Sequence, residues 1–194
     1  MMKCKSALVI AMILFLVSSL SCSKFVSYQE SNDHFIEYEK KLCEITADFG
    51  FSLENEDSAD YPVLEKHISR NYIVSLSDGD TVRINLDNYL QRENKGIETF
   101  SVEYTISRAE NQFNVELFSA LVNAVSGKKI TTELCTGFID APEERYPVSR
   151  YNRTKSKDEV VAKCNALNFF EDWMIYHSSY IDGREVLSIY GLIG

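Results

Sequence analysis

Alternating hydrophobic and polar residues predict an antiparallel sheet in the first half of the chain. Two alternating runs flank the sequence Asp78-Gly79-Asp80: Tyr72, Val74 and Leu76 before it, and Val82, Ile84 and Leu86 after it. A three-residue loop places Leu76 opposite Val82 and aligns the two apolar faces, whereas a two-residue Asp78-Gly79 turn shifts the register by one residue. Residues 100–106 show the clearest alternation, with an apolar face of Phe100, Val102, Tyr104 and Ile106. We therefore expect an antiparallel meander with one covered face.

Helical spacing predicts three helices around these strands. The first begins near residues 31–33 and ends at Gly50, and its buried stripe consists of Phe35, Tyr38, Leu42, Ile45 and Phe49. The second spans residues 114–126 and is apolar round most of its circumference, which indicates a helix buried on several sides. The third begins at the capping-box sequence Ser156-Lys157-Asp158-Glu159, and its stripe consists of Val160, Cys164, Leu167 and Phe170.

The remaining segments complete a single domain. Residues 54–60 are interpreted as a solvated acidic loop, because their spacing does not fit a calcium-binding loop. Residues 62–68 predict a short helical turn, and residues 130–139 fit either a helix or a strand. A two-residue turn at Asp182-Gly183 predicts a hairpin that pairs Tyr176 with Ile189 and Ser178 with Leu187. The element order predicts an α+β fold, an antiparallel sheet with helices packed on one side, over residues 31–194.

The first 21 residues have the arrangement of a secretory signal. Lys3 and Lys5 form a positive end, residues 7–17 form an unbroken apolar run, and small serines follow at positions 18, 19 and 21. A positive end, an apolar middle and a small polar end are what a signal peptide needs, so this segment is assigned to export rather than to the fold. Residues 22–30 are polar and unpatterned, and we expect them to act as a tether.

The run Leu20-Ser21-Cys22-Ser23-Lys24 resembles the cleavage and acylation site of bacterial lipoproteins, although the leucine usual three places before the cysteine is replaced here by Ser19. The resemblance covers the signal segment only. It implies that Cys22 becomes the first residue, carries acyl chains such as palmitate, and anchors the protein to a membrane of the cell envelope. Two alternatives remain: ordinary cleavage after Ser21 releases a periplasmic or secreted domain, and retention of residues 6–23 makes a membrane anchor at the short limit for about 30 Å of hydrocarbon.

Net charge limits the classes of binding partner, and the cysteine content limits the number of disulfides. Loss of Lys3 and Lys5 with the signal segment changes the formal charge from -9 to -11. An acidic domain repels phosphate backbones, so nucleic acid is excluded as an expected partner. The cysteines beyond Cys22 are Cys43, Cys135 and Cys164, and an oxidising compartment favours one disulfide among them, whereas the alternative is that all are small buried residues.

No catalytic, metal or cofactor motif is recognisable in the sequence. Phosphate-binding glycine loops, the nucleophile elbow and paired-cysteine zinc spacings are absent, and His34, His67 and His177 are assigned ordinary surface or capping roles. Arginine and tyrosine carry many interface hot spots, and they alternate in one proline-containing loop, so we single out Arg145, Tyr146, Arg150, Tyr151 and Arg153 as candidate partner-binding residues. The alternative is a solvated loop whose charges pair with the acidic body.

Together these features predict a cell-envelope lipoprotein whose domain is a non-catalytic binding module for another protein or an envelope component. Two alternatives come from other classes. One is an exported hydrolase with a histidine-based site. The other is an immunity or inhibitor lipoprotein that neutralises an exported toxin. A deep pocket that contains a histidine would favour the hydrolase.

Overall fold

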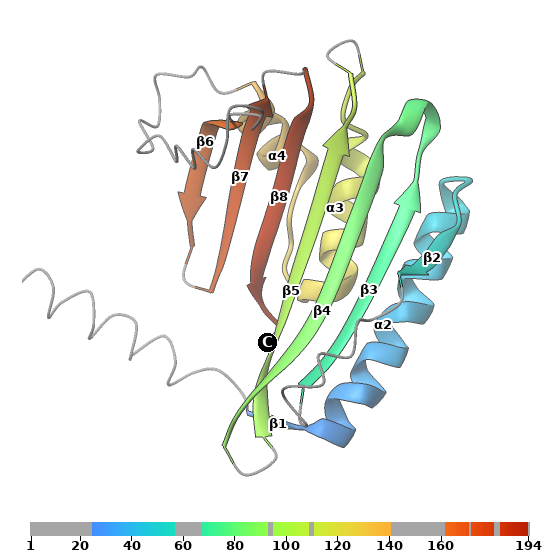
Figure 1. Ribbon diagram of the computed structural model, residues 1–194, viewed down its shortest axis with the longest axis vertical. Helices are drawn as coiled ribbons and strands as arrows, with labels where there is room; N and C mark the ends of the chain where they lie inside the picture. The colour runs from blue at the N-terminus through green and yellow to red at the C-terminus, as the bar shows by residue number, and fades with distance from the viewer. Residues whose placement is uncertain are drawn as a thin grey trace, which may run out of the picture.

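The computed structural model describes residues 25–56, 67–92, 95–108, 111–140, 162–170, 172–180 and 183–193. An antiparallel sheet forms one layer, and the helices lie behind it on one face (Figure 1). The strand order is β2-β3-β4-β5-β8-β7-β6, and the short β1 pairs with β5 at its far end. The predicted α+β fold with helices on one side of a single domain is confirmed.

The described elements follow the chain in this order: β1 Val26–Ser27, α2 Tyr28–Asp48, β2 Leu53–Glu56, β3 His67–Ser75, β4 Thr81–Arg92, β5 Lys95–Ile106, α3 Val115–Ser126, α4 Thr132–Ile139, β6 Ala162–Phe169, β7 Trp173–Tyr180 and β8 Glu185–Leu192. A single 3-10 turn, Ser77–Gly79, joins β3 to β4. Among the described helices, none combines the length and the apolar character needed to cross a bilayer.

The core lies between the sheet and the helices, where the alternation predicted it. The inward-facing residues of β4 and β5 are at most 2% exposed: Val82, Ile84, Leu86, Phe100, Val102, Tyr104 and Ile106. Helix α3 buries Leu117, Phe118, Leu121, Val122 and Val125 against them, which confirms the helix expected to cover the sheet. Burial of each such side chain contributes about 1.5–3 kcal/mol to stability. Asn114 caps this helix, and Gly127 ends it with a φ of 64°.

The β3–β4 turn aligns the two apolar faces but starts one residue earlier than predicted. Val74 lies opposite Val82 and Tyr72 opposite Ile84, so the pairing of Leu76 with Val82 is wrong. The reason is Asp80, which is 6% exposed and is held by side-chain hydrogen bonds beyond the turn. Leu76 donates its N–H to the Asp80 carbonyl at 2.9 Å, so these two residues close the loop.

Helix α2 begins several residues before the predicted start, which shortens the expected tether. The side chain of Ser27 accepts a hydrogen bond from the Glu30 N–H, and Glu30 accepts from the Ser27 N–H, forming a capping box. Val26 is 4% exposed and pairs with Gly96, so residues 26–30 belong to the fold rather than to a tether over 22–30. The predicted stripe packs on the core, with Phe35 and Leu42 fully buried.

Two segments expected as loop or helix contribute strands near one sheet edge. Residues 53–56 form the edge strand β2, so the acidic stretch begins inside the sheet rather than in a solvated loop. Strand β3 begins at His67, so the helical turn predicted up to Ile68 is wrong at that end. The rest of both stretches, residues 57–66, lies outside the described residues. Residues 130–139, which fitted either a helix or a strand, contain helix α4. The side chain of its N-cap residue Thr131 accepts a hydrogen bond from the Leu134 N–H at 3.2 Å.

The third predicted helix is wrong where the structure describes it. Residues 162–169 form strand β6, which pairs antiparallel with β7. The register shifts between Cys164 and Ala166, and such a bulge interrupts the period-two alternation that would have identified a strand. The predicted hairpin register is also wrong by one residue, because Ile189 pairs with Ile175 and Leu187 with His177. This pairing keeps the inward-facing residues of β7 and β8 together.

Candidate binding surface

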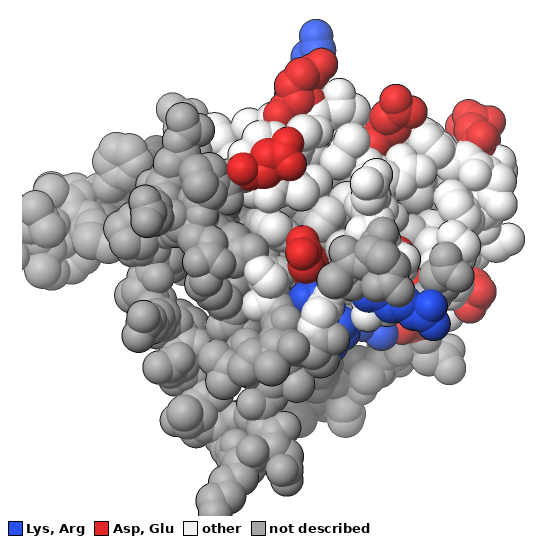
Figure 2. Space-filling view, turned by 90° about the horizontal axis from the view of Figure 1, so that it is seen from above, with Lys and Arg blue, Asp and Glu red and all other residues white. Residues whose placement is uncertain are grey.

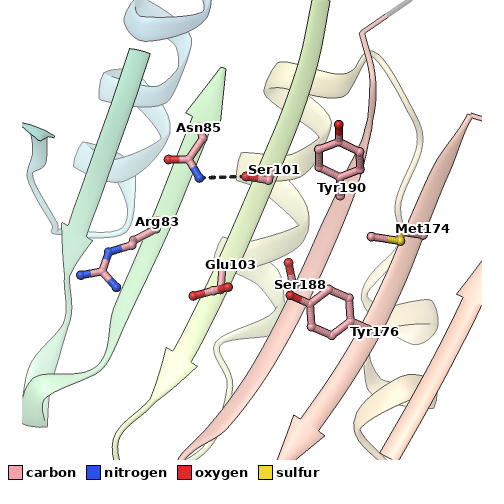
Figure 3. A pocket seen from close by; sticks show the side chains of 8 residues that line it. All are labelled: Arg83, Asn85, Ser101, Glu103, Met174, Tyr176, Ser188 and Tyr190. Atoms are coloured by element: carbon pink, nitrogen blue, oxygen red, sulfur yellow. Dashed lines mark hydrogen bonds between the residues drawn. The ribbon is translucent and has the colours of Figure 1, made fainter. Parts of the chain in front are cut away.

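The side of the sheet opposite the helices carries a shallow depression of about 210 Å³. Successive side chains of a strand point to opposite faces, so the residues between the core positions of β4, β5, β8 and β7 point away from the helices. Figure 3 shows the side chains that line the depression, which are Arg83, Asn85, Ser101, Glu103, Met174, Tyr176, Ser188 and Tyr190.

Strand pairing arranges these residues in two rows that cross the same strands. The first row contains, from β4 to β7, Arg83, Glu103, Ser188 and Tyr176. The second contains, in the same order, Asn85, Ser101, Tyr190 and Met174. Neighbouring strands are about 4.8 Å apart, so each row extends roughly 14 Å across the sheet. The depression is therefore a continuous surface built by the register of the sheet.

The polar contacts within the depression leave one carboxylate without a partner. Asn85 Nδ2 donates a hydrogen bond to Ser101 Oγ at 2.9 Å, which joins β4 to β5. Arg83 Nε lies 3.6 Å from Glu56 Oε1, and Figure 3 shows the Arg83 side chain extending over β3, away from Glu103. The half-buried Glu103 makes no hydrogen bond or ion pair within the described part of the chain. On the next strand, Tyr190 is 40% exposed.

The two histidines whose side chains are described lie outside the depression, each beside a glutamate. His34 Nδ1 is 3.0 Å from Glu98 Oε1, and His177 Nε2 is 2.9 Å from Glu185 Oε2. His177 is 3% exposed, its ring meets the Phe113 ring edge-on at 5.8 Å, and its Nδ1 has no hydrogen-bond partner. As expected for neighbours in a strand, His177 and Ser178 point to opposite faces. The His67 side chain lies outside the described residues.

The cysteines with described side chains are free thiols in different environments. Cys43 is exposed on α2, and Cys135 is a fully buried residue of α4. Burial raises the pKa of the Cys135 thiol to about 11. For Cys43, partial burial and then the nearby Glu39 and Glu44 raise the pKa. The Cys164 side chain lies outside the described residues, so the predicted disulfide is not formed between Cys43 and Cys135 and is otherwise untested.

Buried tyrosines on the helix side are held in the neutral form. Burial, followed by the hydrogen bond that the Tyr72 hydroxyl donates to Glu39 Oε2 at 3.0 Å, raises the pKa of Tyr72. Burial likewise raises the pKa of Tyr104 and of Tyr38. These hydroxyls stay protonated at neutral pH; that of Tyr72 donates to Glu39 on α2, whereas that of Tyr104 accepts a hydrogen bond from the Asn114 N–H at 3.2 Å.

The residues predicted from sequence to carry the function are not among those that the structure describes. Cys22 and the candidate partner-binding residues Arg145, Tyr146, Arg150, Tyr151 and Arg153 fall outside the described residues. Within the described part, no group of three or more histidine, cysteine, aspartate or glutamate side chains is placed to hold a metal ion. Sequence reasoning missed the depression, because its tyrosines lie in a hairpin whose register was predicted one residue away. The available signal was the alternation of Ser101 and Glu103 with apolar residues in β5.

Comparison of the chain with family models, with curated proteins and with solved structures finds no match.

Proposed function

We propose that this chain is a cell-envelope lipoprotein, anchored through lipid on Cys22, whose α+β domain is a non-catalytic module that binds another protein. In this proposal the helix-free face of the sheet is the contact surface, and the two rows of the depression form its centre. Residues 23–25 would form the tether, because the fold begins at Val26. Several acyl chains on one cysteine hold a membrane stably, at about 0.8 kcal/mol per buried methylene.

The observation that carries the proposal is the composition and shape of the depression. Tyrosine, methionine and arginine are enriched at protein interfaces, and here they occur together as Tyr176, Tyr190, Met174 and Arg83. The depression holds about 210 Å³, which is smaller than the roughly 300–1,000 Å³ typical of small-molecule pockets. Its size therefore favours a macromolecular contact over an enclosed small ligand.

The hydrolase alternative receives less support. The residues that line the depression include no histidine, and the described histidines face glutamates on the helix side. An immunity or inhibitor role is a narrower form of the same binding proposal, and it would use the same surface.

Lipidation is tested by the intact mass of protein extracted with detergent from the cells that produce it. The expected mass is that of residues 22–194 with added glyceride and acyl groups, and Cys22→Ser should abolish this addition and move the protein out of the membrane fraction. A bare mass that begins at Cys22 would contradict the anchor and make the domain periplasmic or secreted.

The contact surface is tested by photo-crosslinking with p-benzoylphenylalanine at two positions of similar exposure. Tyr190 is 40% exposed on the helix-free face, and Ile36 is 44% exposed on α2. We expect a discrete adduct of defined mass from position 190 and none from position 36. Identical adduct patterns at both positions, or adducts from position 36 alone, would contradict the assignment of this face.

A further inference from the structure

The carboxylate of Glu103 occupies the middle of the depression without a counter-ion. It lies in the first row between Arg83 and Ser188, is half-buried, and makes no hydrogen bond or ion pair within the described residues. Removing a carboxylate partly from water without a partner is unfavourable, and a charge-assisted hydrogen bond compensates this cost. A ligand that brings a positive charge to this point therefore gains an interaction that the free protein does not satisfy.

Arg83 does not supply that charge, although it is the cross-strand neighbour of Glu103. Its Nε lies 3.6 Å from Glu56 Oε1 on β2, and its side chain extends over β3 in the direction away from Glu103 (Figure 3). The side chains of Arg83 and Glu56 are 50% and 41% exposed, so this pair forms at the rim. The centre of the depression keeps its negative charge.

Aromatic rings flank the same point on its other side. Tyr176 lies in the row of Glu103, with Ser188 between them, and Tyr190 lies in the second row on the strand next to Glu103. Figure 3 shows the Tyr176 ring beside Ser188, on the side toward Glu103, and Met174 beyond Tyr190 in the second row. The faces of tyrosine rings attract ammonium and guanidinium groups within about 6 Å of the ring centre. A carboxylate and one tyrosine ring thus share a row, and a second tyrosine lies in the neighbouring row, a combination that suits an organic cation.

We propose that this depression binds a lysine or arginine side chain of a polypeptide partner, with Glu103 as counter-ion, Tyr176 as the aromatic wall in the same row and Tyr190 as an aromatic contact in the second row. This inference rests on the proposed binding function and specifies the chemistry of the partner. A polypeptide fits better than a free small cation, because the depression is shallow and continues along two rows of side chains. Arginine and tyrosine contacts of this kind carry much of the energy of protein interfaces.

The charge of the whole protein is complementary to such a partner. The chain has a formal net charge of -9, and Figure 2 shows acidic side chains spread over the end of the molecule seen from above, whereas most of the visible basic ones lie in one smaller area. An acidic field increases the association rate of a basic partner and the salt dependence of the binding. We therefore expect affinity for the cationic partner to fall as ionic strength rises.

The test uses the full chain in non-ionic detergent, with its methionine methyl groups labelled with ¹³C. Met174 lines the depression, so its methyl resonance, assigned with Met174→Leu, reports occupancy. The probes are the capped pentapeptide Gly-Val-Lys-Val-Gly and its matched forms with arginine or glutamine at the centre. The lysine and arginine peptides should shift the Met174 resonance in a saturable way, and the glutamine peptide should not. Equal shifts with all three peptides, or none with the cationic ones, would overturn the inference.

Matched variants separate the role of Glu103 from general charge effects. Glu103→Gln should weaken binding of the lysine peptide about tenfold, because it removes the charge and keeps the shape. Glu54→Gln makes the same change of charge on the same face but outside the depression, and it should bind as the parent protein does. Equal affinity of Glu103→Gln and the parent protein, with both variants giving parental methyl spectra, would contradict a counter-ion role.

Two outcomes distinguish this inference from the broader proposal. If crosslinking at position 190 captures a discrete partner while the cationic peptides leave Met174 unchanged, the contact surface stands and the cation site is wrong. Binding of tetramethylammonium as tight as that of the lysine peptide would overturn the polypeptide assignment and indicate a small cationic ligand instead.

Discussion

His34 and Glu98 are 64 residues apart in the chain, yet the His34 Nδ1 lies 3.0 Å from the Glu98 Oε1 and joins α2 to β5. The Glu98 side chain is 4% exposed, whereas that of His34 is 38% exposed. The pair therefore satisfies a carboxylate that the fold buries on the helix side of the sheet. Glu98 also accepts a hydrogen bond from the Ile193 N–H through its backbone carbonyl at 3.0 Å, which ties the end of the chain to the same point.

Removal of the His34 imidazole should destabilise the protein, because it leaves the buried Glu98 carboxylate unpaired. We expect His34→Ala to lower the free energy of unfolding by about 1–3 kcal/mol. Urea unfolding followed by circular dichroism measures this change. Ile36→Ala is the control, since Ile36 is 44% exposed on the same helix and should change stability by less than about 0.5 kcal/mol. Equal effects of the two substitutions would contradict a stabilising pair.

Asp80 should be the residue that sets the β3–β4 register. Its Oδ1 accepts hydrogen bonds from the Ser107 N–H at 2.7 Å and from Asn111 Nδ2 at 2.8 Å. Asp80→Ala leaves these donors without an acceptor and should cost at least about 1.5–3 kcal/mol of stability, as measured by urea unfolding. Asp80→Asn keeps an oxygen acceptor of similar shape and should lose less. If Asp80→Asn lowered stability as much as Asp80→Ala, the side-chain hydrogen bonds of Asp80 would not be the cause of the destabilisation.

Leu121 should be a major contributor to the core. It is fully buried on α3, under the centre of the sheet, and Leu121→Ala should lower stability by about 2–5 kcal/mol because it removes apolar contacts and leaves a cavity. Glu116→Ala on an exposed turn of the same helix is the control. Thermal unfolding measures both variants, and a melting temperature of Leu121→Ala equal to that of the control would refute the placement.

Substitution of two glycines by alanine should have opposite effects. A Cβ at Gly191 would lie 2.6 Å from the Trp173 Cβ and 2.9 Å from the Asp172 carbonyl oxygen, so Gly191→Ala should destabilise the protein by about 1–3 kcal/mol. A Cβ at Gly137, within helix α4, meets nothing within 4 Å, so Gly137→Ala should stabilise by about 0.5–1 kcal/mol. Two melting curves suffice for this test, and a change of the same sign in both variants would be inconsistent with the packing around Gly191.

Cys43 and Cys135, the thiols that the structure describes, should react with alkylating reagents at very different rates. Cys43 is exposed, whereas Cys135 is buried and its pKa is raised to about 11, so less thiolate forms there. At pH 8, mass spectrometry of protein treated with iodoacetamide should show Cys43 modified first and Cys135 only after unfolding. Parallel modification of both sites in the folded protein would contradict the burial of Cys135.

Burial of the Cys135 thiol should make the protein less stable as the pH rises in the alkaline range. The Cys135 pKa rises from 9.0 to about 11 on folding, so between these values the unfolded chain has released a proton that the folded chain keeps. The contribution of this group to stability is therefore fully present below pH 9 and is lost as the pH rises toward 11. Cys135→Ala should show a smaller loss of stability over this interval than the parent protein.

The fold class was predictable because the sequence alternates where packing is regular. In β5 the residues Phe100, Val102, Tyr104 and Ile106 lie on one face, and α3 combines an Asn114 cap with a Gly127 stop, so local patterning and tertiary burial agree. The start of α2 could also have been predicted from local sequence, because Ser27 and Glu30 have capping-box spacing. A capping-box spacing alone is not sufficient, however, since the one at residues 156–159 predicted a helix where residues 162–169 form a strand.

By itself, the sequence determined that the chain forms an antiparallel sheet with helices on one side, because side-chain periodicity reflects which face of each element is buried. It did not determine register, since a bulge near Asn165 hides the alternation of β6 and the buried Asp80 moves the first turn by one residue. Only the tertiary structure placed Glu103 on the strand next to that of Tyr190 and in one row with Tyr176, because the pairing of β5 with β8 and of β8 with β7 sets these positions. A site built from strands that are distant in the chain leaves no local sequence pattern. Its residues can be recognised as a site only when the backbone hydrogen bonds between the strands show which side chains are neighbours.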